Sequence, residues 1–358
     1  MLRWLAGVAV LAGATAPAAV AAPARDRIVV PAAAPRAVTV GVSGDLLPHL
    51  PVVARAVAYG GGRPDFRPML RRIRPWVRRN DLSLCHVETP LVPGTPSGYP
   101  RFSSPPELAH AIRWAGFDAC STASNHSVDR GAYGIATTRR ALGRQGVRHT
   151  GSSSTERQRR KLLLLRAGGA RIAFLAYTQH TNGLPLPHAW SVNLAGAGPI
   201  VRAARRARRA GADAVIVNLH WGTEYQHAPD PFQDALARAL ARSGAITAVV
   251  GQHAHVVQPI RRIDGMPVVF GEGNLLSNQT PACCAPGSQD GMLVQLRLRV
   301  ASGRAGVTEI RYVPTWVRHP DYTVVRAAPG SASYRRTTGV AGRGPHLTPA
   351  GNRAAARR

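Results

Sequence analysis

Short apolar runs alternate with longer amphipathic stretches from residue 37 onward. The runs predict buried β-strands, because four to eight residues rich in Val, Ile and Leu between turn residues are typical of such strands. The predicted strands are 37–42, 82–87, 161–165, 171–177, 214–219, 246–250 and 267–270. Helical periodicity between them predicts helices at 107–115, 133–144, 200–209 and 232–242. This alternation of strands and helices predicts an α/β domain.

The pattern changes toward the end of the chain. Alternating apolar residues over 292–300 and 307–313 predict a closing antiparallel hairpin. Residues 327–358 are rich in Gly, Ser, Pro and Arg, so we expect a flexible basic tail there. The 358 residues can bury a large core, and no linker interrupts the middle of the chain. We therefore expect a single domain over 37–320.

Residues 1–21 have the pattern of a signal peptide. Arg3 supplies a positive start, residues 5–11 form a short apolar run, and Ala19-Val20-Ala21 resembles a cleavage site. The run is too short to span a bilayer, and the alternative is an alanine-rich start with no targeting role. We expect a secreted or extracytoplasmic protein with no transmembrane segment after signal removal. Residues 22–36, rich in Ala and Pro, are expected to form a tether.

The four cysteines leave the disulfide pattern open. In an exported chain Cys85, Cys120, Cys283 and Cys284 permit one or two disulfides, and the sequence does not choose among the pairings. Neighbouring Cys283 and Cys284 would be strained if joined to each other. Cys85 and Cys120 lie in apolar stretches and equally fit buried free cysteines.

The formal net charge of +28 favours anionic partners, because such a field concentrates them near the surface. Lys161 is the only lysine, so a general bias toward arginine is the competing explanation. The densest runs, 71–79, 202–209 and 353–358, match no nucleic-acid-binding motif. We expect an anionic polymer or phosphoester substrate, or an anionic cell-surface polymer, and no specific nucleic acid.

Metal-binding residue types follow the predicted strands. The carboxyl ends of strands in such sheets are where sites gather. The residues at these positions are Asp45, Glu88, Asn125, His126, His220, His253 and His255. Carboxylate oxygens and neutral imidazoles suit divalent Mn, Zn or Fe, and six or seven such residues exceed what one tetrahedral ion needs. We therefore expect two divalent metal ions.

Each feature taken alone has an ordinary structural explanation. Gly44-Asp45 after a strand is more often a turn than a ligand. His253 and His255 are also compatible with a surface location, although a spacing of two in an extended segment puts both rings on one side. The shared position of all these residues at strand ends favours a common site.

The same residues carry a family resemblance. Successive motifs over 38–317 resemble those of the CapA family, the bacterial poly-γ-glutamate capsule biosynthesis group of the calcineurin-like metallophosphatase superfamily. The motifs are Gly44-Asp45, His86-Val87-Glu88-Thr89-Pro90-Leu91, Ser124-Asn125-His126 with Asp129 and Gly131, His220-Trp221-Gly222 with Glu224-Tyr225, Gly251-Gln252-His253-Ala254-His255, and Gly273-Asn274. The resemblance implies a four-layer α-β-β-α sandwich of two mixed sheets, with metals at one edge.

The resemblance also implies roles for individual residues. Asp45 and His255 would hold one ion, Asn125, His220 and His253 the other, and Glu88 would bridge them. His126 would donate a proton to a leaving group or clamp a substrate oxyanion, Asp129 would orient His126, and Glu224 would support the ligands. Two residues depart from the family pattern: His86 and Ser124 each stand where the family usually has Asn. His86 could add a ligand or change the preferred metal, whereas His49 is expected to be a loop residue.

These features predict a secreted, binuclear metal-dependent hydrolase that handles poly-γ-glutamate or a related capsule polymer. One alternative is a secreted phosphoesterase acting on nucleotides or phosphate esters, because the same metals serve that reaction. The other is a polyanion-binding protein without catalytic activity, in which the arginines bind and the metals are structural. The reaction itself does not follow from these residues.

Overall fold

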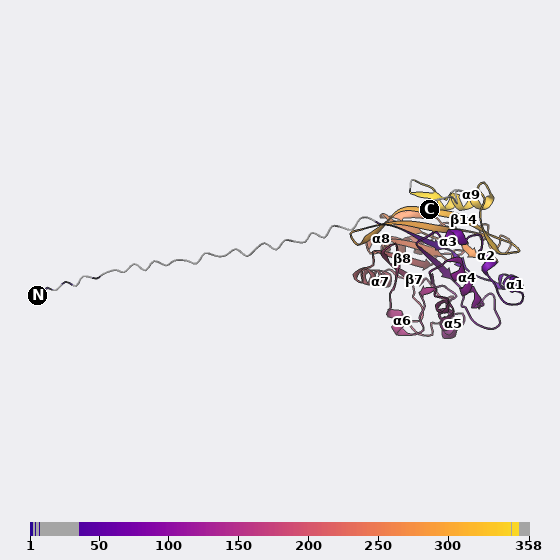
Figure 1. The fold of residues 1–358 in the computed structure, drawn as a ribbon, viewed down its shortest axis with the longest axis horizontal. Coiled ribbons are helices and arrows are strands. Elements are labelled where there is room, and N and C mark those ends of the chain that lie inside the picture. Colours follow the sequence, from indigo (N-terminus) through magenta and orange to yellow (C-terminus); the bar gives the residue numbers. More distant parts are fainter. Residues whose placement is uncertain (3, 5–6, 8–35, 345, 351–358) are drawn as a thin grey trace. The chain divides into compact units, whose positions relative to one another are not determined.

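Two mixed β-sheets form the centre of the fold, which the structure describes over 36–344 and 346–350. The computed structural model describes residues 1–2, 4, 7, 36–344 and 346–350 (Figure 1). The predicted signal peptide and tether lie almost entirely outside these residues and stay predictions. Within the described part of the chain, no helix has the length and apolar character needed to cross a membrane.

The first sheet contains ten of the described strands. Its main order is β12 (Asn274–Leu276), β2 (Asp45–Leu46), β3 (Leu82–Val87), β1 (Arg36–Ser43), β13 (Asp290–Ala301), β14 (Arg304–Arg318) and β15 (Thr323–Arg326). In addition, β4 (Ala119–Ser121) pairs with β3 and β5 (Arg148–Thr150), and β16 (Leu347–Pro349) pairs with β14. Strands β2, β3, β4 and β5 run parallel, so their carboxyl ends lie at one edge.

The second sheet contains six described strands. Their order is β10 (Ile260–Ile263), β11 (Met266–Val269), β9 (Ala248–Gln252), β8 (Ala214–His220), β7 (Ala170–Thr178) and β6 (Leu163–Ala167). The four central strands are parallel and the two edge pairings are antiparallel. As in the first sheet, parallel neighbours carry the residues that follow their carboxyl ends to a common edge.

Helices flank the two sheets. They are α1 (Leu50–Tyr59), α2 (Arg67–Leu70), α3 (Arg74–Val77), α4 (Glu107–Ala115), α5 (Gly131–Arg144), α6 (Glu156–Arg160), α7 (Ala197–Arg209), α8 (Pro231–Arg242) and α9 (Ala332–Ala341). Apolar side chains of α1 to α4 pack with Cys85 and Val87 of β3. Helices α7 and α8 pack on the second sheet, and Figure 1 shows them beside β7 and β8.

Side chains alternate between the two faces of each strand, so one sheet contributes to two hydrophobic cores. In β7, Ile172 and Phe174 point into the core between the sheets, whereas Ala173 and Leu175 point toward α7 and α8. In β1, Val38 and Val40 reach the core between the sheets from the other side. The predicted four-layer α-β-β-α sandwich of two mixed sheets is therefore confirmed.

The predicted elements correspond to observed ones, with small shifts. The helix at 107–115 and the strand at 82–87 have the predicted bounds. Two strands, β6 and β9, begin and end two residues later than predicted. In β9 the shift arises because Gly251 and Gln252 continue the ladder opposite Leu219 and His220, although they are not part of the apolar run. The hairpin is confirmed, since β13 and β14 pair antiparallel, with Leu296 opposite Ile310.

The prediction of a flexible tail is wrong for α9 (Ala332–Ala341) and β16 (Leu347–Pro349). Ser331 caps α9 by accepting a hydrogen bond from the Tyr334 backbone N–H, and Thr337 and Thr338 are buried. The Arg336 guanidinium binds the buried Asp290 carboxylate at 2.8 and 3.1 Å. Strand β16 then runs parallel to β14. The segment is polar in composition, but Ser331, Arg336 and Thr338 form hydrogen bonds within the fold.

The structure joins Cys85 and Cys120 as a disulfide. The two residues stand opposite each other on the parallel strands β3 and β4, with Cα atoms 4.4 Å apart. Cys283 and Cys284 are free. Of the alternatives left open by the sequence, the structure therefore contains one disulfide, between the two buried cysteines.

Candidate metal centre

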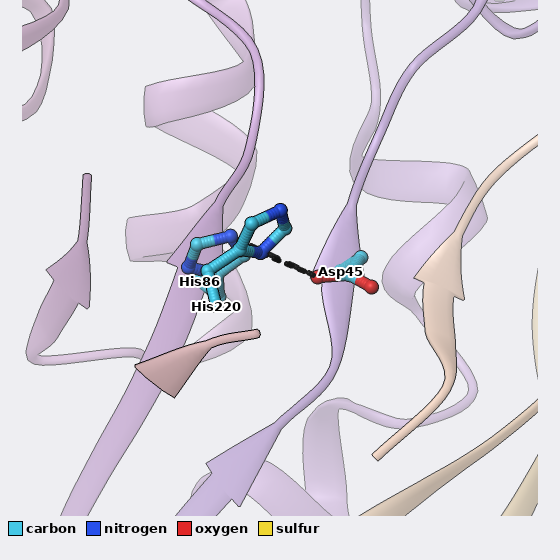
Figure 2. Close-up of side chains that lie close together, drawn as sticks. All are labelled: Asp45, His86 and His220. Carbon is cyan, nitrogen blue, oxygen red and sulfur yellow. Dashed lines mark ion pairs between the residues drawn. The ribbon is translucent and has the colours of Figure 1, made fainter. Parts of the chain in front are cut away.

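The carboxyl ends of strands from both sheets bring the predicted site residues together. Asp45 on β2 stands opposite His86 on β3, and His220 at the end of β8 stands opposite Gln252 at the end of β9. Glu88 follows β3 directly. Figure 2 shows the Asp45 carboxylate facing the imidazoles of His86 and His220. The centre thus lies where the two sheets present their strand ends to each other.

Asp45 is completely buried and contacts three imidazoles. Its Oδ1 lies 3.7 Å from His86 Nε2 and 3.7 Å from His220 Nδ1. Its Oδ2 lies 3.2 Å from His255 Nδ1. The rings of His86 and His220 are stacked, with centroids 4.7 Å apart. His86, whose role the sequence left open, is therefore part of the cluster.

Glu88 occupies a central position between two of the histidines. Its Oε1 lies 3.7 Å from His255 Nε2 and 3.8 Å from His220 Nε2. Glu88 Oε1 therefore approaches His255, which the resemblance assigns to one ion, and His220, which it assigns to the other. This position fits the bridging role that the family resemblance implies for Glu88.

Asn125 and His253 complete the cluster. Asn125 Oδ1 lies 2.8 Å from His220 Nε2, while its Nδ2 donates to Asn182 Oδ1 at 3.3 Å. The His253 backbone N–H donates to Asp45 Oδ2 at 3.3 Å, and its ring lies 4.7 Å from that of His220. All six predicted metal residues thus lie in one buried group.

The donor atoms of this group fit divalent cations. Asp45 Oδ1, both Glu88 oxygens, His220 Nδ1, His253 Nδ1 and both His86 nitrogens are buried without a hydrogen-bond partner. Buried polar atoms are normally paired, because leaving one unpaired costs free energy. Oxygen and imidazole nitrogen together form a donor set suited to Mn, Zn or Fe. The residues present therefore fit the metals that the resemblance implies.

Burial sets the protonation of the cluster. It lowers the pKa of His220 and His253 well below 6.5 and that of His86 to about 4, so these rings are neutral, as metal binding requires. Burial also raises the pKa of Glu88 well above its ordinary value. Burial opposes protonation of His255, but Glu88 and Asp45 outweigh it and raise its pKa to about 10. A bound cation would replace this proton as the charge that compensates the carboxylates.

The backbone around the cluster is tightly constrained. Gly44 lies so close to β12 that a Cβ atom there would be 1.9 Å from the Gly273 carbonyl oxygen. This approach lets the Asp45 N–H donate to that carbonyl at 3.1 Å. His253 and His255 both have positive φ angles, 93° and 55°, which non-glycine residues rarely adopt. Such backbone is costly and is found where a side chain must be held in a particular place.

His126 and Asp129 form a pair beside the cluster. His126 Nδ1 lies 2.7 Å from Asp129 Oδ2, which also accepts a hydrogen bond from the Phe102 N–H at 2.7 Å. The Phe102 ring contacts the His126 ring edge-on, with centroids 4.7 Å apart. Asp129 therefore fixes the orientation of His126 and accepts a hydrogen bond from its Nδ1, which leaves Nε2 for chemistry.

Three neighbouring residues lie outside the six predicted metal residues. Glu224 is exposed, yet it groups with His253 and His255 as a carboxylate able to share a metal. His180, two residues beyond β7, was not predicted, and its ring lies 5.1 Å from that of His253. The strand-end rule that selected the other residues would have selected it too. His49 bonds the Leu47 carbonyl through Nδ1 at 3.0 Å and belongs to no metal-binding group among the described residues, as a loop residue should.

Comparison with known proteins matches the chain to a bacterial capsule family. Residues 39–279 fit the family described as bacterial capsule synthesis protein PGA_cap. The capsule biosynthesis protein CapA of Bacillus anthracis is 27% identical over 242 residues, which cover 64% of this chain and 58% of that protein. The PGA biosynthesis protein CapA of Bacillus subtilis strain 168 is 29% identical over 216 residues, covering 57% and 53%. The chain thus matches little more than half the length of these relatives.

Solved structures with a similar arrangement have low sequence identity to the chain. The calcineurin-like phosphoesterase YfkN from Bacillus subtilis is 15% identical, with a TM-score of 0.48 over 78% of this chain and 90% of that one. A 5'-nucleotidase precursor from Thermus thermophilus is also 15% identical, with a TM-score of 0.44 over 76% and 54%. The family match covers most of the described fold and every residue of the cluster, and the chain accordingly belongs to the bacterial capsule synthesis protein family PGA_cap.

Proposed function

We propose that this protein is a binuclear metal-dependent hydrolase that acts on an anionic polymer in poly-γ-glutamate or capsule biosynthesis, outside the cytoplasm. The observation that carries the proposal is the buried cluster of two carboxylates, an amide and four imidazoles, many of whose donor atoms lack partners. A cluster used only for packing would pair these atoms with one another or with the backbone.

The family resemblance assigns the residues to two ligand sets, with Glu88 beside both. Asp45 and His255 would hold one cation, and Asn125, His220 and His253 the other. When bound, the two cations would acidify a water molecule and stabilise developing negative charge on the substrate. His86 Nε2 approaches the same Asp45 oxygen as His220 Nδ1, so it is available as a further ligand.

His126 supplies the proton transfer in this proposal. Its Nδ1 is held by Asp129, so Nε2 is the atom that delivers a proton to the leaving group or donates a hydrogen bond to an oxyanion. The Phe102 ring and the Phe102 N–H constrain both members of the pair, which keeps the imidazole in one orientation. His126 is mostly buried, so water does not compete freely for the proton.

The substrate class rests on the family and on charge. The matching family and relatives are named for capsule and poly-γ-glutamate synthesis. The chain carries a formal charge of +28, which attracts a polymer of repeated carboxylates. The location outside the cytoplasm is supported by the N-terminal sequence pattern and by the assembly of capsules at the cell surface.

The test is a metal-dependence assay on the full chain. Purified protein reconstituted with Mn or Zn is incubated with poly-γ-glutamate and, separately, with a nitrophenyl phosphodiester. We expect shortening of the polymer that survives high salt, stops with chelator and is lost in Glu88→Gln and His126→Ala. The matched control is His110→Ala, because His110 is exposed on α4.

The other outcomes separate the alternatives. Cleavage of the phosphodiester alone would replace the polymer hydrolase with a phosphoesterase. Polymer binding that ignores chelator and falls steeply with salt, with no cleavage of either compound, would overturn the enzyme proposal and leave a polyanion-binding protein.

A further inference from the structure

A second polar cavity lies apart from the metal centre, where the edges of the two sheets meet. It has a volume of about 380 Å³ and is lined by residues from α5, β5, α6, β6, β7 and α7. This volume is within the range of small-ligand sites. None of the proposed metal residues lines it. We call it the basic cavity.

Five cationic side chains line the basic cavity. They are Arg139, Arg148, Arg159, Lys161 and Arg206, and they come from four different elements and one connection. No Asp or Glu is among the described residues that line it. None of the five forms an ion pair with a carboxylate in the described part of the chain. The walls therefore concentrate positive charge that the protein does not neutralise.

Two of these cations are held in place by neutral partners. Arg139 is partly buried and donates to the Ser152 carbonyl, and Arg206 Nη2 donates to the Arg160 carbonyl at 3.2 Å. Burial lowers the pKa of Arg139, which reflects the cost of keeping a cation away from water without a carboxylate. His149 beside it has its pKa lowered to about 4 by burial and by Arg139, so it is neutral. An anion entering the cavity would relieve this cost.

Asn193, which lines the basic cavity, carries an acceptor without a partner. Asn193 donates through Nδ2 to the Ala176 carbonyl at 3.0 Å, whereas its Oδ1 is buried and unpaired. This oxygen would accept an N–H. A ligand that places an amide N–H a short distance from a carboxylate would therefore satisfy both features of the wall. A chain of γ-linked glutamate has one free carboxylate and one amide N–H in each repeat.

The basic cavity is also adjacent to the catalytic region. Ser152 lines it and lines the small cavity that contains Glu88. Ser152 Oγ lies 2.8 Å from Thr122 Oγ1, and Thr122 lines the small cavity. The two cavities are therefore neighbours that share Ser152.

We propose that the basic cavity binds a γ-glutamyl segment of an anionic polymer, with the carboxylate on the cationic side chains and the amide N–H on Asn193 Oδ1. The identity of the polymer rests on the proposed function. The cavity itself would operate without metal, since no proposed metal ligand contributes to it.

The test measures binding in the absence of metal. Anisotropy of an end-labelled, short γ-glutamate oligomer is titrated with the full chain in chelator. The test variant is Arg148→Gln with Lys161→Gln, both exposed, so the fold is preserved. The matched control is Arg238→Gln with Arg242→Gln, which removes two exposed arginines from α8, outside the basic cavity. We expect the first pair to weaken binding about tenfold and the second about twofold or less.

A second comparison tests the role of Asn193. Asn193→Leu should weaken the γ-glutamate oligomer severalfold more than it weakens polyacrylate, which has carboxylates but no amide N–H. If the Arg148/Lys161 and Arg238/Arg242 double variants weaken binding of the oligomer equally, or if neither weakens it, the basic cavity is not the binding site. If Asn193→Leu weakens binding of the oligomer and of polyacrylate by the same factor, the γ-glutamyl assignment is overturned.

The proposal fails independently of the hydrolase. If the polymer is never cleaved but binding shows the expected pattern, the proposed function falls and the basic cavity stands. If the polymer is cleaved and the two charge-matched pairs bind alike, the proposed function stands and the basic cavity falls. Inorganic phosphate and free glutamate are compared as competitors of the bound oligomer. If phosphate displaces the oligomer at a lower concentration than free glutamate does, the assignment of a carboxylate ligand is overturned.

Discussion

Asp129 Oδ2 lies 2.7 Å from His126 Nδ1 and the same distance from the Phe102 N–H. One carboxylate oxygen therefore holds both a candidate proton donor and the loop that packs on it. This arrangement makes Asp129 a positioning residue, which acts through His126.

Asp129→Asn tests this positioning role. The neutral amide would no longer stabilise positive charge on the His126 ring, which Nε2 needs in order to donate a proton while Nδ1–H is bonded, so we expect kcat to fall about ten- to a hundredfold. The bound metal should not change, because Asp129 is not among the ligands. Kinetics at several pH values, beside elemental analysis, provide the readout. Loss of metal together with activity would show a structural role instead.

His86→Asn tests whether His86 contributes to metal binding. His86 Nε2 approaches Asp45 Oδ1 at 3.7 Å, and both of its nitrogens are buried without partners. We expect the apparent affinity for Mn or Zn to fall about tenfold or more. His49→Asn is the control, because His49 is nearby but bonds the Leu47 carbonyl. Unchanged affinity in His86→Asn would contradict the assignment.

Reduction of the Cys85–Cys120 disulfide should destabilise the fold. The bond closes a loop with a sequence separation of 35, for which chain entropy predicts a contribution of about 3 to 4 kcal/mol to the free energy of unfolding. Urea unfolding of the oxidised protein, compared with the reduced protein and with Cys85→Ala/Cys120→Ala, measures it. Reductant should leave the double variant unchanged. Equal stability of the oxidised and reduced forms would contradict the bond.

His149 should make the protein less stable in acid. Its pKa falls from 6.5 to about 4 in the folded state, chiefly because of burial. The unfolded chain therefore binds a proton that the folded chain does not, and stability present above pH 6.5 is lost as the pH falls toward 4. At about pH 5 we expect a loss of roughly 1 to 2 kcal/mol. Urea unfolding in chelator, above pH 6.5 and at about pH 5, measures the loss of stability in the wild type and in His149→Gln. We expect a smaller loss in His149→Gln. An equal loss in the two proteins would show that His149 is not its cause.

The fold was predictable from the sequence where apolar runs coincide with strands. The runs of β3 and β7 gave bounds correct to within one residue, because alternate side chains fill a core on each face. The prediction of a flexible tail was wrong because it relied on composition. Arg336 and Ser331 satisfy polar groups within the fold, and composition alone does not reveal such pairing.

The candidate site was predictable to the extent that it follows strand ends. Asp45, Glu88 and His220 follow or end parallel strands, so one rule located all three. His180 obeys the same rule after β7 and was missed because no family motif marked it. The sequence left open whether His86 joins the cluster, since this depends on the parallel register that places it opposite Asp45.

The metal content of the purified protein tests the central claim most directly. Elemental analysis is made on the wild type, Asp45→Ala and His253→Ala, with the exposed His110→Ala as the control. We expect about two divalent ions per chain in the wild type and the control, and fewer in both cluster variants. A wild-type protein that holds no metal after reconstitution with Mn or Zn would contradict the binuclear centre and the hydrolase built on it.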